Sequence, residues 1–203
     1  DAIIGIVGLG YVGLPLSLRF SMQGFKTIGF DIDSFKIDMI NSGKSYINHI
    51  AKEKIKKAIN NDFLATNDLN KINELDVIII CVPTPLDEEN HPDLSFIQST
   101  LKSIKPFLKE YQLLILESTS YPGTTEEEIS DFIQKIPNDN KSIDPKFDVG
   151  KNFFIGYSPE REDPGNKDYT IKNIPKIVSG ITKSCLLLTD TLYAQVIDKT
   201  VPV

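Results

Sequence analysis

Residues 3–13 of this 203-residue chain read Ile3-Ile4-Gly5-Ile6-Val7-Gly8-Leu9-Gly10-Tyr11-Val12-Gly13. The first five residues form a short apolar run, which is typical of a strand buried on both faces in a parallel sheet. Three glycines follow at Gly-x-Gly-x-x-Gly spacing, and Leu14-Pro15 then begins a helical pattern with proline in its first turn. The stretch therefore predicts a strand, a tight turn and a helix in immediate succession.

Each glycine of this turn has a separate expected role. Gly8 permits the tight bend, Gly10 lets the backbone approach a pyrophosphate, and Gly13 lets the helix pack closely on the strand. The N-terminus of the helix then offers free N–H groups and the positive end of its dipole to the phosphates. The turn predicts a dinucleotide-binding site.

Asp31 ends the next apolar run, about 20 residues beyond the turn, where a dinucleotide-binding domain places an acid. Its carboxylate can accept hydrogen bonds from the 2′-hydroxyl of an adenosine ribose and would repel a 2′-phosphate. No Arg or Lys directly follows Asp31, where an NADP-binding domain often has one. We therefore expect NAD rather than NADP as the cofactor. The alternative is an aspartate that merely begins a turn.

Short apolar runs alternate with longer amphipathic segments along the chain. The expected strands are residues 3–7, 27–30, 77–82, 113–116, 153–157 and 176–179. The expected helices are residues 14–23, 34–41, 51–60, 95–109, 124–136 and 182–196. This alternation predicts an α/β fold, a Rossmann-type doubly wound parallel sheet with helices on both faces. We expect residues 1–203 to form one NAD-binding domain of this kind.

The composition is that of an ordinary globular protein, with 40% hydrophobic and 25% charged residues. The net charge of -6 argues against a nucleic-acid partner and against binding to an anionic membrane. No apolar run is long enough to span a bilayer, and Asp1 is unlike the basic start of a secretory signal. Cys81 and Cys185 lie far apart without Cys-x-x-Cys spacing. We therefore expect two buried thiols, no metal site and a cytoplasmic location.

Ligands of an open parallel sheet bind beyond the carboxyl ends of its strands. Three expected strands end in a hydroxyl or carboxylate side chain beside a proline: Val82-Pro83-Thr84-Pro85, Glu117-Ser118-Thr119-Ser120-Tyr121-Pro122-Gly123 and Tyr157-Ser158-Pro159-Glu160-Arg161. One such ending is typical of a turn, but three at one edge indicate a functional site. A carboxylate such as Glu160 near a nicotinamide can act as a general base or position a water. A solvent-facing Glu160 paired with Arg161 is the alternative.

These segments resemble the UDP-glucose/GDP-mannose dehydrogenase family over essentially the whole chain. The matching pieces are the glycine turn with Leu14-Pro15, Cys81-Val82-Pro83-Thr84-Pro85, Glu117-Ser118-Thr119 with Pro122-Gly123-Thr124-Thr125, and Ser158-Pro159-Glu160-Arg161. Residues 45–50 and 157–166 are similar to the branch acting on UDP-N-acetylhexosamines. The UDP-glucose branch usually carries Asn-Pro-Glu-Phe at the position of Ser158. UDP-N-acetylglucosamine is the favoured substrate, with the mannosamine and galactosamine epimers and UDP-glucose as alternatives.

The resemblance implies oxidation of the sugar C6 alcohol to a carboxylate in two NAD-dependent steps, through a thioester on a cysteine that water hydrolyses. It assigns the adenosine and pyrophosphate side of NAD to Gly8, Gly10, Tyr11, Val12, Gly13, Asp31 and Lys36. It assigns the ribose and nicotinamide end to Val82, Pro83, Thr84, Ser118 and Thr119. Thr119 and Glu160 would position or activate the hydrolytic water.

The family's nucleophilic cysteine lies in a glycine-rich motif beyond residue 203, after a long dimer-forming helix. Neither Cys81 nor Cys185 matches that motif. The resemblance therefore implies a homodimer for the full-length protein, with the UDP-sugar bound by a C-terminal domain that this chain lacks. We expect the 203-residue chain to bind NAD without turnover. The alternatives are a dehydrogenase of hydroxy acids or acyl thioesters, and a non-catalytic NAD-binding or redox-sensing module.

Overall fold

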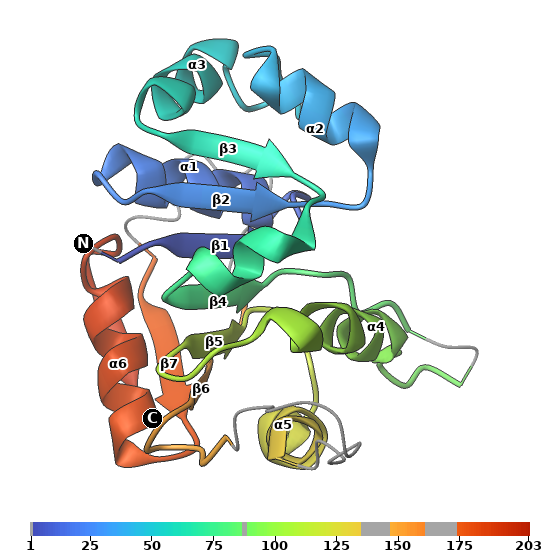
Figure 1. The fold of residues 1–203 in the computed structure, drawn as a ribbon, viewed down its shortest axis with the longest axis vertical. Coiled ribbons are helices and arrows are strands. Elements are labelled where there is room, and N and C mark those ends of the chain that lie inside the picture. The colour runs from blue at the N-terminus through green and yellow to red at the C-terminus, as the bar shows by residue number, and fades with distance from the viewer. Residues whose placement is uncertain (1, 87–88, 135–146, 161–173) are drawn as a thin grey trace.

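The computed structural model describes residues 2–86, 89–134, 147–160 and 174–203. In these residues, eight strands form one sheet in the order β3-β2-β1-β4-β5-β6-β7-β8 (Figure 1). The strands are β1 (Ile4–Val7), β2 (Thr27–Phe30), β3 (Phe63–Thr66), β4 (Val77–Ile80), β5 (Leu113–Leu116), β6 (Phe154–Tyr157), β7 (Lys176–Gly180) and β8 (Thr200–Pro202). Strand order reverses between β1 and β4, which confirms the predicted doubly wound α/β fold.

Helices cover both faces of the sheet, as the sequence predicted. The α-helices are α1 (Gly13–Met22), α2 (Ser34–Asn41), α3 (Lys52–Asn60), α4 (Ser95–Ile104), α5 (Asp131–Gln134) and α6 (Lys183–Tyr193). Shorter elements are the 3₁₀ helices η1 (Leu69–Glu74) and η2 (Lys105–Phe107) and the π-helix η3 (Thr124–Ser130). The helix predicted over 95–109 ends as an α-helix at Ile104, because Pro106 has no N–H and disfavours helical geometry before it.

The hydrophobic core has two layers, one on each face of the sheet. On one face, Phe20 of α1 and Tyr193 of α6 pack together, with 6.4 Å between their ring centroids. On the other face, α4 contributes Ile97 and α5 contributes Ile133 to a second buried cluster. Helices α2 and α3 pack with α1 at the β3 end of the sheet, where Figure 1 shows them beyond β3.

The sequence did not predict strands β3 and β8. In β3 the burial alternates, with Phe63 and Ala65 buried and Leu64 exposed, so the strand has no continuous apolar run. β8 is only three residues long and includes Pro202. The predicted all-parallel sheet also needs a correction, because β7 runs antiparallel to β6.

Six strands end at the same level along the edge of the sheet that follows their carboxyl ends. The register aligns the last residues of β1 to β6, namely Val7, Phe30, Thr66, Ile80, Leu116 and Tyr157. The residues that come next therefore lie side by side along that edge, among them Gly8, Asp31, Cys81, Glu117 and Ser158. Because β7 is reversed, its first residue, Lys176, lies at this edge as well.

Candidate cofactor site

The glycine turn has the geometry that its three glycines predict. Gly8 has φ of +95°, and a Cβ there would lie 2.7 Å from the carbonyl oxygen of Cys81. At Gly13 a Cβ would lie 1.8 Å from the Gly8 carbonyl oxygen, so only glycine allows α1 to start this close to β1. A Cβ at Gly10 would meet nothing within 4 Å. Two glycines are thus needed to form the turn, whereas the third keeps an open side.

Asp31 connects the end of β2 to the glycine turn. Its Oδ2 accepts a hydrogen bond from the backbone N–H of Leu9 at 2.9 Å, and its Oδ1 accepts one from the N–H of Asp33 at 2.9 Å. The Lys36 ammonium group lies 3.0 Å from the same Oδ2. The predicted acid and the predicted turn are therefore in direct contact.

Tyr46 makes a second contact with the glycine turn. Its hydroxyl donates to the carbonyl oxygen of Leu9, the residue whose N–H binds Asp31. Burial raises the pKa of Tyr46, and the nearby Asp31 and Asp33 carboxylates raise it further, so this hydroxyl stays a donor. The sequence indicated no role for Tyr46 beyond its place in the family-like segment 45–50. The hydroxyl contact became visible only in the folded chain.

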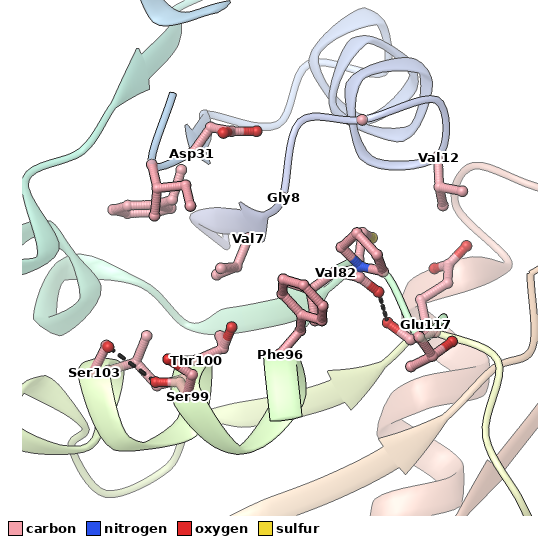
Figure 2. Close-up of a pocket in the computed structure, with 18 of the residues that line it drawn as sticks. Val7, Gly8, Val12, Asp31, Val82, Phe96, Ser99, Thr100, Ser103 and Glu117 are labelled. Carbon is pink, nitrogen blue, oxygen red and sulfur yellow. Dashed lines mark hydrogen bonds between the residues drawn. The ribbon is translucent and has the colours of Figure 1, made fainter. Parts of the chain in front are cut away.

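A cavity of about 600 Å³ lies beyond the carboxyl ends of β1, β2, β4 and β5 (Figure 2). Figure 2 shows Asp31 and Glu117 on opposite sides of it, with Gly8 between them. Twelve of the thirteen site residues predicted from the sequence line the cavity: Gly8, Gly10, Tyr11, Val12, Asp31, Lys36, Val82, Pro83, Thr84, Ser118, Thr119 and Glu160. Gly13 lies behind the turn and is buried.

This cavity suits a dinucleotide. Its volume is within the range of cofactor pockets, and its lining includes Gly10, which has open space beside it and precedes the start of α1, where no side chain caps the helix. One end holds the carboxylate of Asp31, and the other holds the polar ends of β4 and β5. Ser118 braces that second end, because its hydroxyl donates to the Val82 carbonyl oxygen at 2.7 Å.

Helix α4 provides a wall of the cavity that the sequence did not predict. Phe96, Ser99, Thr100 and Ser103 line the cavity from one side of the helix (Figure 2). The Ser103 hydroxyl donates to the Ser99 carbonyl oxygen at 2.9 Å, as is common for serine within a helix. In the sequence these small hydroxyl side chains are typical of a solvent-exposed helix surface, because the sequence does not indicate that this side of the helix faces a cavity.

A buried trio of polar side chains lies at the Glu117 end. Glu117 is 3% exposed, and its Oε1 accepts a hydrogen bond from the Lys176 ammonium group at 2.6 Å. Its Oε2 accepts a hydrogen bond from the hydroxyl of Tyr193, which is fully buried. Burial raises the pKa of Glu117, and the Lys176 charge opposes that rise. The sequence predicts that Glu117 lies at a strand end, but it does not indicate which side chains bind its carboxylate.

The comparison with known families decides between the dinucleotide-binding folds. The model of the UDP-glucose/GDP-mannose dehydrogenase family, NAD binding domain, matches residues 2–197. This chain belongs to that family. Its cofactor is NAD, as the acid at the end of β2 predicted.

Members of the UDP-glucose/GDP-mannose dehydrogenase family resemble the chain closely. The UDP-N-acetyl-D-glucosamine 6-dehydrogenase of Pseudomonas aeruginosa is 36% identical, over 97% of this chain and 44% of that protein. The UDP-N-acetyl-D-mannosamine dehydrogenase of Methanococcus aeolicus is 36% identical, over 96% of this chain and 42% of that protein. The UDP-N-acetyl-mannosamine dehydrogenase Cap5O from Staphylococcus aureus has a structure with a TM-score of 0.87 at 28% identity, over 100% of this chain and 47% of that one. The chain thus spans less than half the length of each.

The two thiols of this family member are both buried. Cys81 lines the cavity, but burial raises the pKa of its thiol, and the Glu117 carboxylate raises it further. Cys185 lies inside α6 with its side chain fully buried. Both are placed as the sequence predicted for core residues.

Some predictions concern residues that the structure does not describe. Arg161 and the rest of the family-like segment 161–166 lie outside the described residues. Within the described ranges, no helix has the length and apolar character needed to cross a bilayer. In the same part of the chain, no group of three His, Cys, Asp or Glu side chains is arranged to hold a metal ion.

Proposed function

We propose that this chain is the NAD-binding domain of a dehydrogenase that oxidises the C6 alcohol of a UDP-N-acetylhexosamine to the carboxylate. UDP-N-acetylglucosamine is the favoured sugar. The observation that carries the proposal is the cavity itself, in which the glycine turn, Asp31 and the polar ends of β4 and β5 line one continuous space. The names of the relatives compared above, a UDP-N-acetyl-D-glucosamine 6-dehydrogenase and a UDP-N-acetyl-D-mannosamine dehydrogenase, support the sugar class.

The cavity suggests how the chain's own residues contribute. The open side of Gly10 and the start of α1 would hold the pyrophosphate, and Asp31 with Lys36 would hold the adenosine ribose. Val82, Pro83, Thr84 and Ser118 would then shape the place of the nicotinamide. NAD supplies the hydride acceptor when it is bound.

The second half of the reaction needs a water molecule. Thr119 and Glu160 line the nicotinamide end of the cavity, so we propose that they position the water that hydrolyses a thioester. The proposed nucleophile is a cysteine outside these 203 residues. Burial holds the Cys81 thiol in its protonated form by raising its pKa, which leaves it a poor nucleophile.

The proposal includes the domain organisation of the whole protein. Residues 1–203 would form one NAD-binding domain, and a further domain would bind the UDP-sugar, contribute the cysteine and form a homodimer. The lengths of the relatives support this organisation, because this chain matches 42–44% of the two enzymes compared above.

The test is a measurement of NADH formation at 340 nm. A protein that contains this chain together with its UDP-sugar domain should form two NADH for each UDP-N-acetylhexosamine. The 203-residue chain alone should bind NAD and form no NADH. Turnover of UDP-glucose in preference to every UDP-N-acetylhexosamine would contradict the proposed substrate, and NADH formation by the chain alone would contradict the proposed nucleophile.

A further inference from the structure

A buried carboxylate, that of Glu117, lies at one end of the cavity. Glu117 lines the cavity, and both of its carboxylate oxygens are occupied by donors from elsewhere in the fold. Lys176 comes from the start of β7 and Tyr193 from the end of α6. A carboxylate fixed by two donors behind it has little freedom to turn away from the cavity.

The trio has a defined polarity. The Lys176 side chain is 7% exposed and its ammonium group lies 2.6 Å from Glu117, so the two charges form a buried dipole. Glu117 is the charged end that lines the cavity. Because the field of a buried charge is weakly screened, the negative end of this dipole acts on whatever occupies the adjacent space. Glu160 adds a second carboxylate to the same end.

The fold indicates which part of the dinucleotide lies there. Asp31 at the end of β2 defines the adenosine side, and the glycine turn at β1 defines the pyrophosphate. The strand order places β4 and β5 on the other side of β1. The nicotinamide therefore lies toward Glu117. Its ring carries a positive charge in NAD⁺ and is neutral in NADH.

We propose that Glu117, held by Lys176 and Tyr193, makes this site favour the oxidised cofactor over the reduced one. Glu117 is a positioning residue that acts through its charge and takes no part in hydride or proton transfer. The inference rests on the cofactor orientation in the proposed function. It is independent of the sugar.

Such a preference serves an enzyme that uses two NAD⁺ for each substrate. After the first oxidation, NADH must leave and a second NAD⁺ must enter while the partly oxidised sugar is retained. A carboxylate that stabilises the cationic ring makes NADH bind more weakly than NAD⁺. The exchange between the two steps is then favoured in the direction that the reaction needs.

The test is the ratio of the dissociation constants of NADH and NAD⁺, measured by calorimetric titration of the 203-residue chain. Glu117→Gln keeps the shape of the side chain and removes its charge. We expect this substitution to lower the NADH/NAD⁺ ratio of dissociation constants about tenfold. Tyr193→Phe is the matched control, because it removes a hydrogen bond from the same carboxylate and keeps the charge. Its ratio should stay within about twofold of the unmodified chain.

A second variant guards against a folding defect. Glu117→Gln combined with Lys176→Met removes both buried charges together, so the ratio should still fall, but by less than in Glu117→Gln, which leaves the Lys176 charge unpaired. ADP-ribose, which lacks the nicotinamide, should bind equally to all of these proteins. An unchanged ratio in the charge-removing variants would overturn the inference. Failure of NAD⁺ and ADP-ribose to bind to the unmodified chain would instead contradict the cofactor placement in the proposed function.

Discussion

Lys36 and Asp31 form a close ion pair at the wall of the cavity, with 3.0 Å between the ammonium nitrogen and Oδ2. The side chain of Asp31 is only 6% exposed, whereas the side chain of Lys36 is 30% exposed. The sequence predicts NAD because the Asp31 carboxylate would repel a 2′-phosphate and because no basic residue directly follows it. The fold nevertheless brings a lysine to the acid from the first turn of α2. We therefore expect discrimination against NADP to depend on the negative charge of Asp31.

Replacing Asp31 should change the choice of cofactor. Asp31→Ser removes a carboxylate that can accept hydrogen bonds from the ribose, so we expect NAD to bind at least about tenfold more weakly. The same change leaves Lys36 without its partner and close to the place of a 2′-phosphate. NADP should therefore bind to Asp31→Ser better than to the unmodified chain, as measured by titration with both cofactors. Adding Lys36→Ala to Asp31→Ser should remove that gain; if the gain remains, Lys36 is not its source.

Substitutions of two glycines of the turn should have different effects, one on NAD binding and the other on stability. Gly10→Ala places a methyl group in open space, so the free energy of unfolding should change by less than about 1 kcal/mol. The same methyl group lies where the pyrophosphate approaches, and NAD should bind about tenfold or more weakly. Gly13→Ala places Cβ 1.8 Å from the Gly8 carbonyl oxygen and should cost about 3 kcal/mol of stability. Urea denaturation and NAD titration distinguish the two, and equal losses of stability would contradict this account.

Tyr46 should contribute to both stability and binding through its contact with Leu9. Tyr46→Phe removes the hydroxyl and leaves the Leu9 carbonyl oxygen without that donor. We expect a loss of about 1 kcal/mol in the free energy of unfolding and a weaker affinity for NAD. Tyr111→Phe is the control, because Tyr111 is 70% exposed and does not line the cavity. If both substitutions have the same small effect, the Tyr46 hydroxyl does not brace the turn.

Lys176 should be needed to balance the buried charge of Glu117. Lys176→Met leaves that carboxylate buried without a counter-ion and should cost about 3–5 kcal/mol of stability at neutral pH. Burial raises the pKa of Glu117, so a proton can replace the lysine at low pH. The loss should therefore be small near the usual pKa of glutamate and grow as the pH rises. Urea denaturation at several pH values measures this trend. Adding Glu117→Gln should restore most of the stability, and no recovery would rule out charge as the cause.

The Cys81 thiol should be unreactive although it lines the NAD cavity. Burial raises its pKa, and so do the carboxylates of Glu117 and Glu160, so the reactive thiolate is scarce even at mildly alkaline pH. We expect iodoacetamide to label Cys81 slowly in the native chain from pH 7 to 9 and rapidly in urea. Mass spectrometry of the peptides follows each cysteine separately, with fully buried Cys185 as the internal reference. Rapid native labelling at pH 7 would show that Cys81 can act as a nucleophile.

The cofactor turn was predictable because its signals are local. Gly8, Gly10, Gly13 and Asp31 lie within one β-α-β unit, and each has a residue type that few other positions require. The same holds for the polar strand ends after β4, β5 and β6. Parallel strands in a common register bring such endings to one edge, so twelve of the thirteen predicted residues line a single cavity.

Other parts of the site depend on long-range contacts that no local pattern encodes. Glu117 meets Lys176 and Tyr193, which are 59 and 76 residues away along the chain. In the sequence, Lys176 begins an apolar run and Tyr193 ends an amphipathic helix, so both resemble ordinary surface and core residues. The direction of β7 was equally hidden, because a short apolar run reads the same whether the strand is parallel or antiparallel.

The reversal of β7 determines how short a working piece of this protein can be. The strands that carry the glycine turn, Asp31 and Glu117 are complete by Leu116, well before the chain reaches β7. Lys176 and Tyr193, which bind the Glu117 carboxylate, come later in the chain. A piece cut after β6 would leave this buried carboxylate without either donor, so we expect a stable NAD-binding piece to extend through the end of α6.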